Sequence, residues 1–170
     1  MSIPFWIAMA GWLFTYANSR SLARQSEANS IGAAIDKMLQ EIADENYKFW
    51  RDTDSQGESY ALKCQLFQSY ISFRCDFIEE RVEALSAKCR TIIFYDGDVE
   101  LFEPAAIALI GSIREVATLN SEEGASMSES ERRRKILVVN KHTLDLHGLI
   151  SRFISNRYRP IFAANKKVRS

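Results

Sequence analysis

The sequence predicts an all-α protein in which a single N-terminal transmembrane helix continues into a cytoplasmic bundle of about four helices. Three observations predict this fold. An uncharged apolar run opens the chain, long stretches without proline or glycine follow it, and apolar residues then recur at alternating intervals of three and four. With 7 glycines and 3 prolines in 170 residues, turn residues are too few for a fold of many short strands.

Three segments are expected: a transmembrane anchor at residues 1–19, a helical bundle at residues 20–164 and a basic tail at residues 165–170. Apolar residues make up 46% of the chain, which is enough to form a sizeable core. The three cysteines have no CxxC spacing, a pattern typical of buried thiols in a reducing compartment.

The anchor is predicted from residues 1–17, which carry no charge. This length lies at the short end of what crosses a bilayer. Arg20 and Arg24 follow the run and no basic residue precedes it, so the positive-inside rule predicts a single-pass protein with its N-terminus outside and its C-terminal domain in the cytoplasm. A cleaved signal peptide, a buried core helix and a helix lying in the membrane interface are the alternatives.

Small or weakly polar residues recur at helical spacing within this run and form a stripe. The stripe consists of Ala8, Gly11, Thr15 and Asn18. Such stripes let helices approach closely. The stripe therefore predicts self-association in the membrane, and in a ring of such helices it would line a pore.

The first helix is expected to continue from the membrane to about Trp50 and to end in the polar turn at residues 51–57. Ser59 is a suitable N-cap for the second and longest helix, which is expected to reach about Tyr95. A seam of apolar residues at alternating steps of four and three follows this helix: Ile71, Cys75, Ile78, Val82, Leu85, Cys89 and Ile92. Such a seam packs against neighbouring helices in a bundle.

Two further helices complete the predicted bundle. A turn at residues 96–98 precedes a third helix that has Pro104 in its first turn, and a flexible polar loop is expected at residues 120–128. Ser128 and Glu131 form a capping box at the start of the fourth helix. This helix is expected to run to about residue 159, where a proline stops it.

The formal net charge is zero, but the two halves of the chain differ. Residues 27–103 contain 16 acidic and 8 basic residues, whereas residues 127–170 contain 3 acidic and 11 basic residues. Either the halves pair with each other, or the basic half binds an anionic partner such as nucleic acid or lipid. The candidate anion-binding residues are Arg132, Arg133, Arg134, Lys135, Arg152, Arg157 and Arg159.

No residue pattern specifies a reaction, a metal or a cofactor. The acidic residues between Asp96 and Glu103 do not have the spacing of an EF-hand loop. His142 and His147 lie five positions apart, which separates their rings around a helix, and a hydrogen bond within the bundle explains each histidine better than zinc does. Phosphate-binding loops, nucleophile elbows and zinc-protease motifs are absent from the sequence. We expect no catalytic residue, no metal and no cofactor.

A helical bundle with a basic last helix is similar in outline to HEPN ribonuclease-type domains. The signature of that family is an arginine four to six residues before a histidine. Arg134 lies eight residues before His142, and no arginine lies within six residues before His147. The resemblance therefore covers the architecture and implies a degenerate HEPN-like domain without the nuclease motif.

These features together predict a non-enzymatic, membrane-anchored, self-assembling protein that acts as a scaffold or as a pore. Small bacterial accessory proteins of stress or phage-defence systems share this layout. The expected partners are membrane lipid and further copies of the chain. A binding module that holds nucleic acid or a protein partner through the basic C-terminal region is the alternative.

Overall fold

The computed structural model describes residues 3–52, 58–89 and 97–158. These residues form four α-helices and a short 3₁₀ helix, and they contain no strand. The helices are α1 (Ile3–Arg51), α2 (Glu58–Cys89), α3 (Gly97–Thr118) and α4 (Glu129–Arg157), and the 3₁₀ helix η1 (Ser121–Glu123) lies between α3 and α4. The predicted all-α bundle is confirmed.

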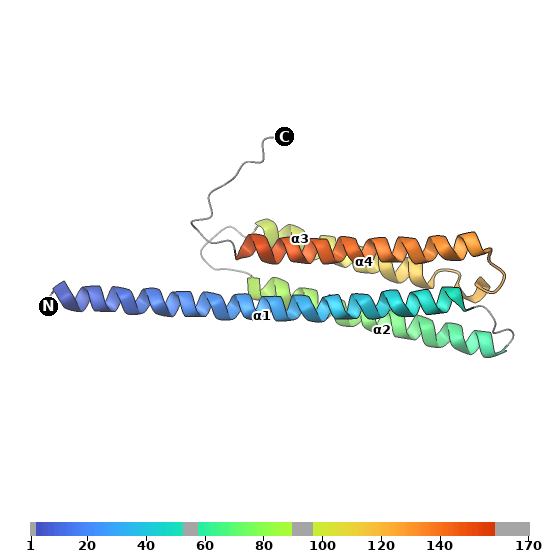
Figure 1. The fold of residues 1–170 in the computed structure, drawn as a ribbon, viewed down its shortest axis with the longest axis horizontal. Helices are drawn as coiled ribbons and strands as arrows, with labels where there is room; N and C mark the ends of the chain where they lie inside the picture. Colours follow the sequence, from blue (N-terminus) through green and yellow to red (C-terminus); the bar gives the residue numbers. More distant parts are fainter. Residues whose placement is uncertain (1–2, 53–57, 90–96, 159–170) are drawn as a thin grey trace, which may run out of the picture.

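Successive helices run in opposite directions (Figure 1). Helix α1 packs against α2 and α4, and α3 packs against the same two helices. Two contacts fix the register of α1 on α2. The rings of Phe49 and Phe67 stack with centroids 3.9 Å apart, and Glu27 pairs with Lys88 toward the other end of the bundle. This is the up-and-down arrangement that short connections between amphipathic helices favour.

The apolar seam of α2 lies in the centre of this bundle. Its members from Ile71 to Leu85 are completely buried, and Cys89 is nearly so. Ile92 lies outside the described residues. On α1 the buried apolar residues begin at Ala28 and continue to Trp50, spaced so that they share one face of the helix.

Helix α1 extends well beyond the other three helices at the end where its N-terminus lies (Figure 1). Every side chain from residue 5 to residue 24 is exposed. We call residues 5–24 the projecting segment. The helix passes from this segment into the bundle without a break, because no proline or turn cluster interrupts α1 after its first turn.

The predicted single-pass membrane localisation, with the N-terminus outside and the C-terminal domain in the cytoplasm, is wrong. None of the helices in the described ranges combines the length and the mean hydropathy that a bilayer span requires. The uncharged run ends before Arg20, and tryptophan, tyrosine, threonine, glycine and asparagine side chains within it lower its mean hydropathy. The length of the uncharged run alone therefore does not make this segment a transmembrane helix.

Helix α3 begins earlier than the sequence predicted. Pro104 lies inside the helix instead of in its first turn, because Val99 and Phe102 upstream of it are buried in the core and extend the helix toward Gly97. Pro104 itself is exposed, so the loss of its backbone donor occurs on the solvent side. The predicted end of the second helix, at residues 90–95, lies outside the described residues.

The segment between α3 and α4 packs against the bundle, although a flexible loop was predicted. Ser121 is completely buried, and its carbonyl oxygen accepts a hydrogen bond of 2.8 Å from the Tyr60 hydroxyl. Gln68 donates to the Ser121 hydroxyl at 2.7 Å. These contacts join the segment to α2.

The predicted capping box is confirmed at the start of α4. The backbone N–H of Glu131 donates to the Ser128 hydroxyl at 3.3 Å, and the backbone N–H of Ser128 donates to the Glu131 carboxylate at 2.9 Å. Two backbone donors that the helix cannot satisfy are thereby paired.

Candidate functional site

The projecting segment exposes large apolar side chains on most of its circumference, outside the small-residue stripe. Its aromatic residues are between 51% and 77% exposed: Phe5, Trp6, Trp12, Phe14 and Tyr16. Ile7, Leu13 and Leu22 are at least half exposed as well. Single exposed apolar residues are ordinary on protein surfaces, whereas a contiguous set of this size marks an interaction surface.

The predicted small-residue stripe lies within the projecting segment. Ala8, Gly11, Thr15 and Asn18 are all exposed, and a side chain added at Gly11 would meet no atom within 4 Å. The Thr15 hydroxyl donates back to the Gly11 carbonyl at 2.9 Å, so it makes its hydrogen bond within its own helix. The stripe is therefore open to close approach by another helix.

A basic crevice of about 350 Å³ lies at the base of the projecting segment, where α1 meets the ends of α2 and α4. We call it the base crevice. Its lining comes from three helices and consists of Ala17, Ser21, Arg24, Lys88, Cys89, Arg157 and Tyr158. Three of these side chains are cationic, and they are far apart in the sequence.

The electrostatics of the base crevice follow from its cations and its partial burial. Lys88 Nζ lies 2.5 Å from Glu27 Oε2 in an ion pair. This contact holds the pKa of the Glu27 carboxyl below its ordinary value. Burial and the neighbouring Cys89 raise the pKa of Tyr158 to about 12, although the charges of Arg157 and Arg24 act to lower it. The Tyr158 hydroxyl is therefore a hydrogen-bond donor at neutral pH.

The predicted anion-binding residues do not form one patch. The cluster from Arg132 to Lys135 lies in the first turns of α4, at the end of the bundle away from the projecting segment (Figure 1). Arg157 lies about 36 Å along the helix from Arg133, at 1.5 Å per residue. Arg159 lies outside the described residues.

Lys135 has a structural role at its end of the bundle. Its ammonium group donates to the carbonyl oxygens of Val116 and Leu119 at the end of α3, and it lies 4.6 Å from the centre of the Trp50 ring. A cation at this position satisfies carbonyl groups that the helix leaves unpaired.

The described ion pairs lie largely among α1, α2 and α3. Arg74 pairs with Glu41 at 2.8 Å, and Arg114 pairs with Asp76 at 2.7 Å and with Glu79 at 2.9 Å. Arg74 belongs to the acidic part of the sequence and Arg114 follows it, and both neutralise acidic side chains of that part.

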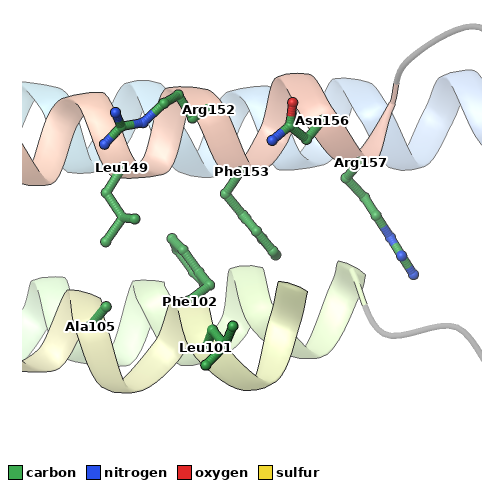
Figure 2. A pocket seen from close by; sticks show the side chains of 8 residues that line it. All are labelled: Leu101, Phe102, Ala105, Leu149, Arg152, Phe153, Asn156 and Arg157. Atoms are coloured by element: carbon green, nitrogen blue, oxygen red, sulfur yellow. The ribbon is translucent and has the colours of Figure 1, made fainter. Parts of the chain in front are cut away.

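A second cleft, of about 380 Å³, lies between α3 and α4 at the same end of the bundle as the base crevice. Figure 2 shows Leu149 and Phe153 of α4 pointing toward Phe102 of α3, with Arg157 beside them. The rings of Phe102 and Phe153 stack with centroids 3.9 Å apart. Arg157 lines both the cleft and the base crevice, so apolar and cationic surfaces adjoin at this residue.

The two histidines lie in different surroundings. His147 Nδ1 is 2.7 Å from Asp36 Oδ1 across the α1–α4 interface, which is the kind of hydrogen bond within the bundle that the sequence favoured. His142 is partly buried on another side of α4. Across the ranges 3–52, 58–89 and 97–158, no group of three histidine, cysteine, aspartate or glutamate side chains could hold a metal ion.

Sequence reasoning missed the base crevice because its residues share no local motif. Arg24, Lys88 and Tyr158 come together only through the antiparallel packing of α1, α2 and α4. The sequence signal that could have found them is their position relative to the buried residues of their helices. Lys88 lies next to the last described member of the α2 seam, and Arg24 lies one turn before the first buried residue of α1. Comparison with models of protein families, with curated proteins and with solved structures gives no match.

Proposed function

We propose that this protein is a non-enzymatic assembly module in which the projecting segment packs against the projecting segment of a second copy. The observation that carries the proposal is the run of twenty exposed positions from residue 5 to residue 24, in which large apolar side chains cover most sides of the helix as far as Tyr16. A helix that is apolar on all sides is stable in water when other protein covers it.

The exposed area is large enough for a stable contact. Each aromatic side chain can bury about 150–250 Å², and the five aromatic residues of the segment are on average more than half exposed. Together with Ile7, Leu13 and Leu22 they offer on the order of 800 Å² per chain, which is the share that each partner contributes to a standard protein interface.

A second copy is the occupant that the segment suits best. No charged side chain precedes Arg20, so two copies can align over this length without like charges facing each other. Gly11 and its small neighbours allow two helices to approach closely, since the distance between packed helices depends on the side chains at the contact. Trp12 and Tyr16 stack on each other with centroids 5.7 Å apart and offer a continuous aromatic face.

The test is the mass of the chain in buffer without detergent, measured by sedimentation velocity over a range of concentrations. The native chain should associate as its concentration rises. The variant Trp12→Ser/Phe14→Ser should remain monomeric, because it loses two of the most exposed aromatic side chains of the segment. The matched control Leu137→Ser/Leu144→Ser removes side chains that are 60% and 68% exposed on α4, and it should associate like the native chain.

Two results would overturn the proposal. One is a native chain that stays monomeric at every concentration. The other is equal loss of association in the test variant and in the control, which would assign the contact to general apolar exposure. Sedimentation of a monomeric chain with phosphatidylcholine vesicles would assign the segment to lipid instead of to a second copy.

A further inference from the structure

We propose that the cleft between α3 and α4 binds a small amphipathic monocarboxylate, with the apolar body of the ligand in the cleft and its carboxylate at Arg152. The cleft has a volume of about 380 Å³, which lies within the range of small-ligand sites, about 300–1,000 Å³. Most of its lining residues are apolar, and a few polar groups lie on one side. This combination is typical of sites that hold a ligand in one orientation.

The apolar part of the lining comes from facing positions of the two helices. Phe102 and Phe153 are buried, and their rings stack with centroids 3.9 Å apart. Leu149 and Ala105 line the cleft beside this stack, and Leu101, which is 75% exposed, lines it as well. Figure 2 shows Leu149 pointing from α4 toward α3, with the short side chain of Ala105 opposite it. An apolar group bound between these two side chains would be shielded from water.

The polar part of the lining lies on α4 and contains no acidic residue. Arg152 and Asn156 line the cleft and are exposed, so they lie at its rim. Among the residues that the structure describes, none forms an ion pair or a hydrogen bond with the Arg152 side chain. Its paired N–H donors match the two oxygens of a carboxylate, and the Asn156 amide can donate a further hydrogen bond. Arg157 also lines the cleft, but it takes part in an interaction of its own, so the proposal does not count its charge.

The apolar lining and the charge at the rim together select the class of ligand. A neutral hydrocarbon would gain from the apolar lining but would leave the guanidinium of Arg152 unused. A dianion would carry one charge more than Arg152 compensates, and a cation would be repelled by it. A monocarboxylate with an apolar body uses both parts of the cleft.

The test is isothermal titration of the native chain with sodium octanoate, for which we expect saturable binding of one equivalent. Ala105→Trp places a large side chain at an exposed position in the cleft and should abolish this binding. The matched control Ala33→Trp adds the same side chain at an exposed position of α1 outside the cleft and should bind like the native chain. Leu101→Ser removes an exposed apolar side chain from the lining and should weaken binding about tenfold.

A second pair of variants tests the role of the charge at the rim. Arg152→Gln should weaken octanoate binding about fivefold, because an exposed ion pair is lost, and it should leave the binding of 1-octanol unchanged. Arg133→Gln makes the same change of charge at the far end of α4 and should bind octanoate like the native chain.

Absence of saturable octanoate binding to the native chain would overturn the proposal. Native-like binding by Ala105→Trp would overturn it as well, since the ligand would then lie elsewhere. Equal weakening of octanoate and 1-octanol binding in Arg152→Gln would contradict a contact between the guanidinium and the carboxylate. Equal weakening in Arg152→Gln and Arg133→Gln would assign the effect to the overall charge of the chain.

Ligand binding in the cleft is independent of self-association through the projecting segment. The variant Trp12→Ser/Phe14→Ser leaves every residue that lines the cleft in place, so it should bind octanoate with native affinity even as a monomer. A loss of octanoate binding in this variant would assign the ligand to the projecting segment or to the assembled form, and would overturn the claim that the cleft of one chain is sufficient.

Discussion

The projecting segment and the bundle include parts of the same helix, yet their apolar residues have opposite surroundings. From Ala28 to Trp50 most of the large apolar residues of α1 lie on one face and are buried against α2 and α4, and Tyr47 is the exposed exception. From Phe5 to Tyr16 they lie on most sides of the helix and are exposed. A stripe of apolar residues on one face can be covered within one chain, whereas an apolar surface on most sides of a helix needs cover from another molecule.

The two regions also differ in what stabilises them. The bundle helices gain their stability from buried apolar area, whereas the projecting segment has backbone hydrogen bonds and intrinsic propensity. Helices without tertiary contacts are marginally stable in water. Substitutions in the two regions should therefore have very different effects on the free energy of unfolding of the monomer.

The largest difference is expected for two leucines. Leu85 is completely buried, and Leu13 is 50% exposed. Leu85→Ala should lower the free energy of unfolding by about 2–5 kcal/mol, because it leaves a cavity, whereas Leu13→Ala should change it by less than about 0.5 kcal/mol in the dilute monomer. Urea unfolding followed by circular dichroism measures both. Similar losses for the two variants would contradict the comparison.

The second comparison is between the surroundings of two glycines, Gly124 and Gly11. A Cβ atom at Gly124 would lie 2.2 Å from the Tyr60 hydroxyl oxygen and 3.1 Å from the Ser121 carbonyl oxygen, whereas one at Gly11 would meet no atom within 4 Å. Gly124→Ala should lower the unfolding free energy by about 1–3 kcal/mol through overpacking. Gly11→Ala should be neutral or should stabilise the helix by up to about 1 kcal/mol.

Thermal unfolding would distinguish the two glycine variants. Their midpoints should move in opposite directions, or that of Gly11→Ala should remain unchanged. A native-like midpoint for Gly124→Ala would mean that the segment between α3 and α4 is not fixed against Tyr60.

A smaller effect is expected for the start of α4. Ser128→Ala removes the hydroxyl of the capping box and should lower the unfolding free energy by about 1 kcal/mol. Ser155→Ala changes an exposed serine inside the same helix and should remain within about 0.5 kcal/mol of the native chain. Equal effects in urea unfolding would show that α4 does not depend on its cap.

The smallest expected effect is a dependence of stability on pH. Hydrogen bonds with Ser128 hold the pKa of Glu131 below 4.5, its ordinary value. This carboxylate therefore stabilises the folded chain above the unfolded-state pKa, and the contribution is lost as the pH falls through the lowered folded-state pKa. Between about pH 5 and pH 2, the urea midpoint of Glu131→Gln should fall less than that of the native chain. An equal fall in the two urea midpoints would show that Glu131 does not contribute to the pH dependence of stability.

The sequence predicted the parts of the fold that depend on local pattern. The seam from Ile71 to Leu85 repeats with the period of a packed helix, and the capping box at Ser128 involves residues three apart. The helical start of α3 upstream of Pro104 was missed because burial of Phe102 outweighs the usual position of a proline.

The candidate sites were predictable in part. The apolar residues from Phe5 to Tyr16 are visible in the sequence, but an uncharged run of this length predicts a bilayer span, and the mean hydropathy of the segment is too low for that. The base crevice could not be predicted, because the meeting of Arg24, Lys88 and Arg157 depends on how three helices end relative to one another. Contacts of this kind arise from tertiary packing and leave no local spacing to recognise.

The most direct test of the central claim is hydrogen–deuterium exchange of the native chain at low and at high concentration. Peptides from residues 5–24 should become more protected as the concentration rises, because a second copy covers them, while peptides from residues 28–50 should keep the same protection. Unchanged exchange of residues 5–24 at all concentrations would contradict the claim that another copy of the chain covers the projecting segment.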